Sequence, residues 1–398
     1  MRDKLSQEPL TAVIVAININ RNPEFDEDVA EAIALVESAG YIIKQVITAN
    51  RPRADPKLFV GRGKLDEIKA ICEALEPDAL IINHNILAIQ ERNLDNELGD
   101  VRIVDRTQLI LDIFAARVTS NEGILQIELA QQSYLATRLV GRWKDLDRQR
   151  GGFGMTGGPG EKQIELDKRL IADKVVVLKR RLDAIVKQRD TQRKSRLKSG
   201  INSVSIVGYT NAGKSTLFNL LTKANVYAED RLFATLQTTS RHLFISSGNE
   251  IILSDTVGFI RDLPSKLVAA FRATLEETIY ANLLLQVVDV SHATYQRHIE
   301  DVDSVLKEIS ADNIPQLIVY NKIDLVANIE CEGENEADNI VPKIIYDERQ
   351  EPIAVYLSAK QNLGLDLLRQ AIVEKLDFIR QQKNNKPQDL IYEPWKDR

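Results

Sequence analysis

Apolar and polar positions alternate along residues 10–118 in a way that predicts a small α/β unit. Apolar runs with the length of buried strands fall at 12–18, 41–48, 79–83 and 101–105. Segments with helical periodicity lie between them, at 25–40, which ends in a glycine, and at 86–99. Strands that alternate with helices build a parallel sheet, so we expect one here.

Between residues 121 and 199 the pattern changes to heptad spacing, which is typical of paired helices. Two series repeat at intervals of four and three: Leu125, Leu129, Gln132, Ala136, Leu139 and Trp143, and then Ile171, Val175, Leu178, Leu182 and Ile185. Each predicted helix has one seam, so we expect the two to pair as an antiparallel hairpin. Residues 151–160 between them include six glycines. A helix does not persist through such a stretch, so it should form the hairpin tip.

Residues 203–221 read as an apolar strand, a glycine loop and an amphipathic helix, and the loop matches the pattern G-x-x-x-x-G-K-[ST]. Its backbone N–H groups and the helix N-terminus suit a β-phosphate. Lys214 should reach the β- and γ-phosphate oxygens, and the Ser215 hydroxyl should bind Mg²⁺. Farther along, the motif "DTVG" supplies Asp255, expected to hold Mg²⁺ through water, and Gly258, whose N–H should contact the γ-phosphate.

The motif "NKID" (321–324) follows the apolar run "QLIVY" and predicts specificity for guanine. Guanine presents N1–H and N2–H₂ donors side by side, and the Asp324 carboxylate can accept both, whereas adenine would leave it poorly paired. Asn321 should brace the loop, and the aliphatic stem of Lys322 should cover the base. The backbone N–H groups of "LSAK" (357–360) should face guanine O6. Together these motifs predict a GTP-specific switch.

The residue after Gly258 is Phe259, where many such switches have a glutamine that holds the attacking water. An aromatic ring cannot hold a water molecule, so hydrolysis must be completed by another group. We favour a partner that orders the switch loops and excludes water. An aromatic side chain at this position should point away from the phosphates and pack against apolar residues such as Leu263 or Leu267.

A mobile loop with a threonine that binds Mg²⁺ in the presence of a γ-phosphate is expected within residues 229–242. This stretch contains Thr235, Thr238 and Thr239, and Thr235 is the best placed by its distance from Lys214. The expected metal ligands are therefore Ser215, Thr235 and, through water, Asp255, and the expected catalytic residues are Lys214, Thr235 and Gly258. The full set expected to bind the nucleotide is Gly208, Tyr209, Thr210, Asn211, Ala212, Gly213, Lys214, Ser215, Phe233, Ala234, Thr235, Leu236, Gln237, Asp255, Thr256, Val257, Gly258, Asn321, Lys322, Ile323, Asp324, Ser358, Ala359 and Lys360.

Positive charge is concentrated in one segment of the chain. The formal net charge is −6, but residues 142–198 contain 17 Lys and Arg against 8 Asp and Glu, a local balance of 17 − 8 = +9. This charge beside a glycine-rich tip favours a hairpin that contacts a phosphate-rich surface with its tip. Glycine lets backbone N–H groups come close to an anion. A solvated spacer is the alternative interpretation. The candidate RNA contacts are Arg142, Lys144, Arg148, Arg150, Arg193, Lys194, Arg196 and Lys198.

The composition is that of an ordinary soluble protein with two or three domains, because 44% of the 398 residues are hydrophobic and 28% are charged. Cys72 and Cys331 are far apart and lack metal-ligand spacing, which suits a reducing compartment. The sequence has no signal-peptide pattern and no apolar run long enough to span a bilayer. We therefore expect a cytoplasmic monomer that does not insert into membranes.

The predicted fold class is α/β, with a P-loop GTPase domain preceded by a small parallel α/β domain and an antiparallel two-helix coiled-coil hairpin. The expected boundaries are 1–120 for the N-terminal domain, 121–199 for the hairpin, 200–380 for the GTPase domain and 381–398 for a C-terminal tail.

With these motifs placed, nearly the whole chain resembles the HflX family of GTPases, in the Obg-related translation class. The resemblance is most specific at 61–68, 92–131, 158–169 and 255–277. At the tip the chain departs from the family pattern G-G-x-G-x-R-G-P-G-E, since "GGFGMTGGPGE" has one extra residue and no arginine. The resemblance implies binding to the large ribosomal subunit, with the N-terminal domain and hairpin near the peptidyl-transferase region, in splitting or rescuing stalled ribosomes under stress. It also implies K⁺ as a second candidate cofactor, because related GTPases coordinate K⁺ with an asparagine at the position of Asn211.

Three alternative functions make different demands on the sequence. One is a GTP-regulated ribosome-assembly factor, which the same motifs fit. A protein-binding regulator with the hairpin as a docking arm is disfavoured by the positive hairpin. An RNA-modifying enzyme would need a convergent acid/base or metal set in the N-terminal domain, and the sequence shows none. The four histidines have no metal or triad pattern, so surface or packing roles are expected for His84, His242, His292 and His298.

Overall fold

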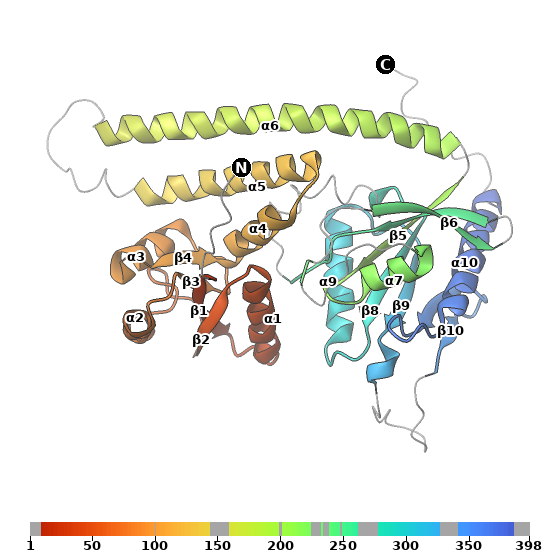
Figure 1. Cartoon of the computed structure of the whole chain (residues 1–398), viewed down its shortest axis with the longest axis horizontal. Helices are drawn as coiled ribbons and strands as arrows, with labels where there is room; N and C mark the ends of the chain where they lie inside the picture. The colour runs from red at the N-terminus through yellow and green to blue at the C-terminus, as the bar shows by residue number, and fades with distance from the viewer. Residues whose placement is uncertain are drawn as a thin grey trace. The chain divides into compact units, whose positions relative to one another are not determined.

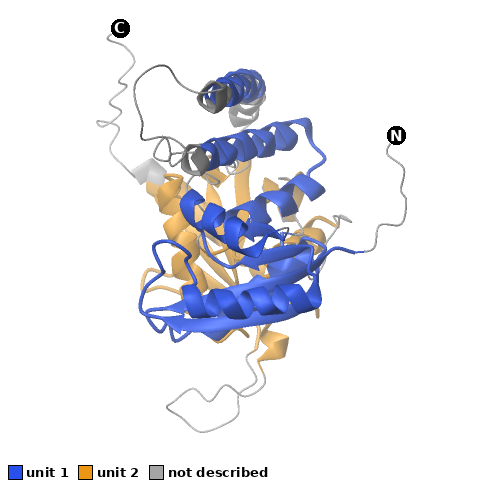
Figure 2. Ribbon diagram, turned by 90° about the vertical axis from the view of Figure 1, so that its left-hand side faces the viewer, with its two compact units in different colours: residues 1–192, 231–233, 262–271 blue, residues 193–230, 234–261, 272–398 orange. Residues whose placement is uncertain are grey.

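The structure of the protein, a computed structural model, describes residues 9–99, 101–143, 159–198, 201–223, 232–233, 239–246, 249–261, 278–326 and 341–385. The chain divides into two compact units (Figure 1, Figure 2). The first unit comprises residues 1–192, 231–233 and 262–271, and the second comprises 193–230, 234–261 and 272–398.

A four-stranded parallel sheet forms the centre of the first unit, with strand order β2-β1-β3-β4. Its strands are β1 (Thr11–Ile19), β2 (Ile42–Arg51), β3 (Ala79–Ile82) and β4 (Arg102–Asp105). The central strands β1 and β3 are almost completely buried, as expected of parallel strands covered on both faces. The four strands predicted from the apolar runs are confirmed, with their ends shifted by a few residues.

One helix follows each of these strands, namely α1 (Phe25–Ser38), α2 (Arg62–Leu75), α3 (Ala88–Leu98) and α4 (Arg106–Arg117) (Figure 1). Helix α1 ends shortly before Gly40, whose φ of 86° lies in the left-handed region that glycine tolerates. Helix α4 begins where the Asp105 carboxylate accepts a hydrogen bond of 2.8 Å from the N–H of Gln108. Asp105 therefore both ends β4 and caps the helix that follows.

The first unit also contains helix α5 (Asn121–Trp143) and residues 159–192 of helix α6 (Pro159–Lys198), and the two helices form an antiparallel hairpin (Figure 1). Lys174 of α6 forms an ion pair of 3.0 Å with Glu128 of α5. The predicted seam positions of α6 are less exposed than most of their neighbours, and Leu178 is fully buried among them. The predicted hairpin is therefore confirmed, while the tip lies outside the described residues. Neither these helices nor any other in the described ranges is long and apolar enough to span a membrane.

Helix α5 has a second buried face, which the heptad pattern did not predict. The Arg138 guanidinium forms a close ion pair with Asp105 and a second one of 3.2 Å with Glu91. The Tyr134 hydroxyl donates to the other Asp105 oxygen at 2.7 Å. Burial raises the pKa of Asp105, and the positive charge of Arg138 opposes this rise. The network attaches α5 to the parallel sheet and to α3.

The second unit is built on a seven-stranded sheet with the order β10-β11-β9-β8-β5-β7-β6. The inner strands are parallel, and the edge strands β6 and β10 pair antiparallel with their neighbours. The strands are β5 (Asn202–Gly208), β6 (Thr239–Ser246), β7 (Asn249–Asp255), β8 (Leu283–Asp289), β9 (Gln316–Asn321), β10 (Lys343–Tyr346) and β11 (Pro352–Tyr356). The described helices are α7 (Lys214–Thr222), α9 (Tyr295–Glu308), the 3₁₀ turn η1 (Ile323–Leu325) and α10 (Leu365–Asn385). Because the carboxyl ends of the parallel strands meet at one edge of the sheet, the loops after β5, β7, β9 and β11 converge there.

Candidate nucleotide site

The loop from β5 to α7 has two positions that only glycine fits. Gly208 has a φ of 149°, and a Cβ there would lie 2.2 Å from the carbonyl oxygen of Val287. Gly213 has a φ of 94°, and its Cβ would lie 2.3 Å from the side-chain nitrogen of Asn321. Both glycines of the predicted phosphate loop are therefore required by the backbone and by close neighbours.

Lys214 is the first residue of α7, and its side chain turns back into the loop. Its ammonium group is buried and donates a hydrogen bond of 2.6 Å to the carbonyl oxygen of Tyr209. Burial lowers the pKa of Lys214 to about 8, and the negative charge of Asp255 partly opposes this shift. A phosphate group bound in this loop would supply the counter-charge that the buried ammonium lacks.

The structure brings the predicted Mg²⁺ ligands Ser215 and Asp255 together. The Ser215 hydroxyl donates to Asp255 Oδ2 at 2.8 Å, and Asp255 is fully buried at the end of β7. The next residue, Thr256, donates its hydroxyl to the carbonyl oxygen of Ile206 at 2.7 Å, which fixes the path of the chain after Asp255. A hydroxyl and a carboxylate side by side are hard oxygen donors, so these residues fit a magnesium ion.

Gly258 lies against the phosphate loop. A Cβ at Gly258 would lie 2.9 Å from Thr210 Cα and 3.0 Å from Lys214 Nζ, so the glycine allows a close approach to the ammonium group. The neighbouring Phe259 donates its N–H to Gly208 O at 3.1 Å, and Phe259 O accepts from Thr210 N–H at 2.7 Å. The segment that is expected to contact a γ-phosphate is thus paired directly with the loop that is expected to bind the β-phosphate.

The side chain of Phe259 is buried, with 2% of its surface exposed. It is therefore packed in the protein, in agreement with the expected apolar role. The packing partners expected from the sequence, Leu263 and Leu267, lie outside the described residues.

An aromatic cluster beside the phosphate loop was not predicted. The ring of Tyr209 stacks on His298 of α9, with centroids 4.1 Å apart and planes inclined by 9°, and His292 lies 4.6 Å from His298. The Tyr209 hydroxyl accepts a hydrogen bond of 2.9 Å from the N–H of Arg261. Tyr209 thereby connects the phosphate loop with α9 and with the chain that follows Phe259. No spacing rule joins these residues, because they lie on separate elements.

Asn321 connects three loops. Two of them are expected to bind the guanine base, and the third is the phosphate loop. It is 2% exposed, and its amide donates to Ala212 O at 2.9 Å and accepts from Ala359 N–H at 2.9 Å. The Asp324 carboxylate accepts a hydrogen bond of 2.5 Å from the Ser358 hydroxyl. The expected base-binding carboxylate and the "LSAK" loop are therefore adjacent.

Lys322 has a left-handed backbone with a φ of 65°, and its ammonium group forms an ion pair of 2.7 Å with Asp289 at the end of β8. This pair fixes the half-buried lysine stem beside Asn321 and Asp324. Asn211 likewise has a left-handed backbone, with a φ of 60°, and its side chain is exposed.

Some of the expected site residues belong to the first unit or lie outside the described residues. Phe233 is packed in the first unit, where its ring lies 4.7 Å from that of Phe114 and its carbonyl oxygen accepts from Arg117 at 3.0 Å. Those outside the described residues are Ala234, Thr235, Leu236 and Gln237, together with the candidate RNA contacts Lys144, Arg148 and Arg150. The other candidate RNA contacts lie on the helices of the hairpin, Arg142 on α5 and Arg193, Lys194, Arg196 and Lys198 on α6.

Comparison with known families gives three matches along the chain. Residues 26–115 match the family described as GTP-binding GTPase N-terminal, and residues 117–196 match GTP-binding GTPase Middle Region. Residues 203–322 match the family described as 50S ribosome-binding GTPase.

Two curated relatives are similar over almost the whole chain. The GTPase HflX of Escherichia coli K12 is 48% identical over 365 residues, which are 92% of this chain and 82% of that protein. The GTPase HflX of Caldanaerobacter subterraneus subsp. tengcongensis is 44% identical over 374 residues, which are 94% of this chain and 82% of that protein. Among solved structures, the complex of SsGBP with GDP aligns with a TM-score of 0.50 and 27% identity, covering 94% of this chain and 99% of that one.

Proposed function

The chain belongs to the HflX family of GTPases, and on this premise we propose that it binds the large ribosomal subunit and that GTP hydrolysis times this binding. The observation that carries the proposal is the positive hairpin, since residues 142–198 have a local charge of +9 in a chain of net charge −6. Ribosomal RNA is the phosphate-rich surface that such a segment suits. The family description of residues 203–322, a 50S ribosome-binding GTPase, supports the same partner.

We assign the nucleotide to the loops at the carboxyl edge of the second sheet. In this assignment the phosphate loop and Lys214 hold the β- and γ-phosphates, and Asp324 accepts the two donors of guanine. Ser215 and Thr235 would hold a magnesium ion directly, and Asp255 would hold it through water. The Ser215 hydroxyl and Asp255 Oδ2 are 2.8 Å apart. At these residues a magnesium ion would supply positive charge against the charge that develops on the phosphates.

In this proposal the large subunit accelerates GTP hydrolysis, because Phe259 replaces the residue that would hold the attacking water. Phe259 is buried and its backbone is paired with the phosphate loop, so this position presents no polar side chain to a water molecule. A bound subunit would order the loops around the γ-phosphate and exclude bulk water. Potassium at the exposed Asn211 is a second contribution, which comparing hydrolysis in KCl and NaCl would test.

The proposed outcome is the splitting or rescue of stalled ribosomes under stress. Ribosome assembly is the alternative, and the two differ in the particle that is bound. A splitting factor should act on complete ribosomes and release both subunits, whereas an assembly factor should bind precursors of the large subunit. Density-gradient profiles of ribosomes incubated with the protein and GTP distinguish these outcomes.

Co-sedimentation with separated ribosomal subunits tests the proposal. We expect the protein to sediment with the large subunit in the presence of a non-hydrolysable GTP analogue, and much less with GDP or with the small subunit. Equal sedimentation with both subunits, or none with either, would show that the large subunit is not the partner.

A further inference from the structure

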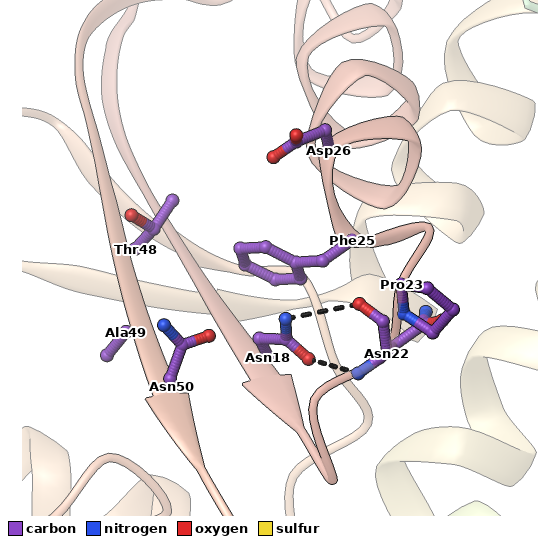
Figure 3. Close-up of a pocket in the computed structure, with 8 residues that line it drawn as sticks. All are labelled: Asn18, Asn22, Pro23, Phe25, Asp26, Thr48, Ala49 and Asn50. Carbon is purple, nitrogen blue, oxygen red and sulfur yellow. Dashed lines mark hydrogen bonds between the residues drawn. The ribbon is translucent and has the colours of Figure 1, made fainter.

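The first unit has a polar cavity that takes no part in the nucleotide site (Figure 3). Its volume is about 330 Å³, at the lower end of the roughly 300–1,000 Å³ that is typical of small-molecule sites. It lies at the carboxyl ends of β1 and β2, beside the turn that leads into α1. The residues that line it are Asn18, Asn22, Pro23, Phe25, Asp26, Thr48, Ala49 and Asn50.

This position in the fold favours ligand binding, because open parallel sheets bind ligands outside the carboxyl ends of their strands. Asn18 of β1 and Asn50 of β2 are partners in the parallel register, so they lie side by side at that edge. The Asn18 side chain donates to Asn22 O at 3.2 Å and accepts from Asn22 N–H at 2.7 Å. These two bonds fix one wall of the cavity before any ligand enters (Figure 3).

The rest of the lining, on α1 and β2, presents polar groups that are not used elsewhere in the described residues. The side chains of Asp26, Thr48 and Asn50 are exposed, and within the described ranges they form no hydrogen bond or ion pair. The half-buried ring of Phe25 extends from the start of α1 between Asn18 and the strand that holds Thr48 and Asn50 (Figure 3). The cavity therefore combines an aromatic surface with an amide, a hydroxyl and a carboxylate.

We propose that this cavity binds an unpaired nucleobase of RNA. Unpaired bases are recognised by stacking on aromatic rings and by hydrogen bonds to their edges, which the Phe25 ring and the Asn50 amide can provide. The Asp26 carboxylate accepts hydrogen bonds, and guanine offers two adjacent donors on one edge. Guanine should therefore bind better than adenine, cytosine or uracil.

The charges around the cavity favour RNA over a free nucleotide. None of the described residues that line it is basic, and α1 has three acidic residues in its first turn, Asp26, Glu27 and Asp28. These carboxylates would repel the concentrated charge of a triphosphate more strongly than the single charge of each RNA phosphate. Arg21, just before Asn22, and Arg53, shortly after Asn50, are exposed and can meet phosphates farther along an RNA strand. The inference rests on the proposed binding of ribosomal RNA and adds a base-specific contact to it.

Binding of labelled eight-nucleotide RNAs to the full chain tests the inference without ribosomes. The RNAs are oligouridylates with one central guanine, adenine, cytosine or abasic site, and GDP in excess occupies the GTPase site throughout. All four carry the same charge, so differences among them report the base and not the phosphates. We expect the guanine RNA to bind about tenfold more tightly than the abasic RNA, a stacking-sized effect of about 1.4 kcal/mol.

Variants at the cavity identify the site of any such preference. Phe25→Leu keeps an apolar side chain, and Asn50→Ala changes an exposed strand end. Both should reduce the affinity for guanine RNA to that for abasic RNA, and Asp26→Asn should remove the preference for guanine. Asp66→Asn makes the same charge change on the exposed face of α2. It should leave the affinity for guanine RNA and the preference for guanine unchanged.

Three results would overturn the inference. They are equal binding of guanine and abasic RNA, a base preference that survives both Phe25→Leu and Asn50→Ala, and competition by guanosine monophosphate as effective as that by the RNA. If any of these is found while the protein still sediments with the large subunit, the cavity assignment fails and the proposed function stands.

Discussion

Asp324 is the residue on which the choice of nucleotide should depend. Asp324→Asn turns one acceptor oxygen into a donor, so we expect it to weaken GTP binding and to let xanthosine triphosphate compete. Competition binding with both nucleotides measures the effect, with the exposed Asp312→Asn as a matched control. If the GTP affinity of Asp324→Asn stays within about threefold of the parent, roughly 0.7 kcal/mol, the guanine assignment is wrong.

Phe259 should support the switch by packing and not by catalysis. Its side chain is buried and its backbone bonds to Gly208 and Thr210, so glutamine there would lose packing without an ordered loop to aim its amide. We expect Phe259→Gln to leave intrinsic GTP hydrolysis within tenfold of the parent, with part of the stimulation by large subunits retained. Phe259→Leu is the apolar control for single-turnover assays. A rise of tenfold or more in the free Phe259→Gln protein, about 1.4 kcal/mol of barrier, would contradict this role.

Single residues of the second unit could be predicted where a motif fixes their spacing and chemistry. The bonds from Ser215 to Asp255 and from Asn321 to Ala212 join residues that the motifs had already named. The stack of Tyr209 on His298 could not be predicted, because it depends on how α9 packs beside the phosphate loop. A histidine on an amphipathic helix has the same sequence pattern whether it faces solvent or an aromatic ring.

At the scale of elements, the attachment of α5 should depend on the buried pair of Arg138 and Asp105. Removing one partner of a buried ion pair costs about 3–5 kcal/mol, because the other charge remains buried. We expect Arg138→Met to speed hydrogen exchange along α5 at least tenfold, and Arg138→Met with Asp105→Asn to recover part of the loss. Lys174→Met breaks the half-exposed pair with Glu128, which should cost less than about 1 kcal/mol. Equal exchange in Arg138→Met and Lys174→Met would show that the buried network does not hold the helix.

The end of α6 should account for much of the salt dependence of subunit binding. Lys and Arg contacts release counterions from RNA, so affinity should fall steeply with ionic strength. We expect glutamine at Arg193, Lys194, Arg196 and Lys198 to flatten the slope of log affinity against log salt concentration.

The matched control for this variant replaces four exposed basic residues of the second unit, Lys307, Lys343, Arg349 and Arg380, and should leave the slope unchanged. An unchanged slope in the α6 variant would place the RNA contacts elsewhere, with the basic segment 51–57 as the next candidate.

Elements with one dominant period were the most predictable. The apolar pattern predicts the seam of α6 well, because a long helix that packs against one partner buries one face and exposes the rest of its surface. The sequence does not predict the second packed face of α5, because this face contains the polar residues Tyr134 and Arg138. Arg138 is buried and Tyr134 partly buried through their bonds with Asp105 and Glu91. The antiparallel edges β6 and β10 were not predicted, since a half-exposed edge strand has a weaker apolar pattern than a central one.

At the scale of the whole molecule, one chain joins a GTPase unit to a positively charged hairpin. The family follows from similarity over more than nine-tenths of the chain, and the proposed nucleotide site consists of motifs that the structure brings together. The charge of the hairpin and the family both support a ribosomal partner.

Single-turnover GTP hydrolysis with purified ribosomal subunits tests this central proposal most directly. We expect the large subunit to accelerate hydrolysis at least tenfold, with saturation, and the small subunit to have little effect. A tenfold acceleration corresponds to about 1.4 kcal/mol of barrier, which the ordered switch loops would supply. If the rate is the same with the large subunit, the small subunit and neither, then the large subunit does not complete this site.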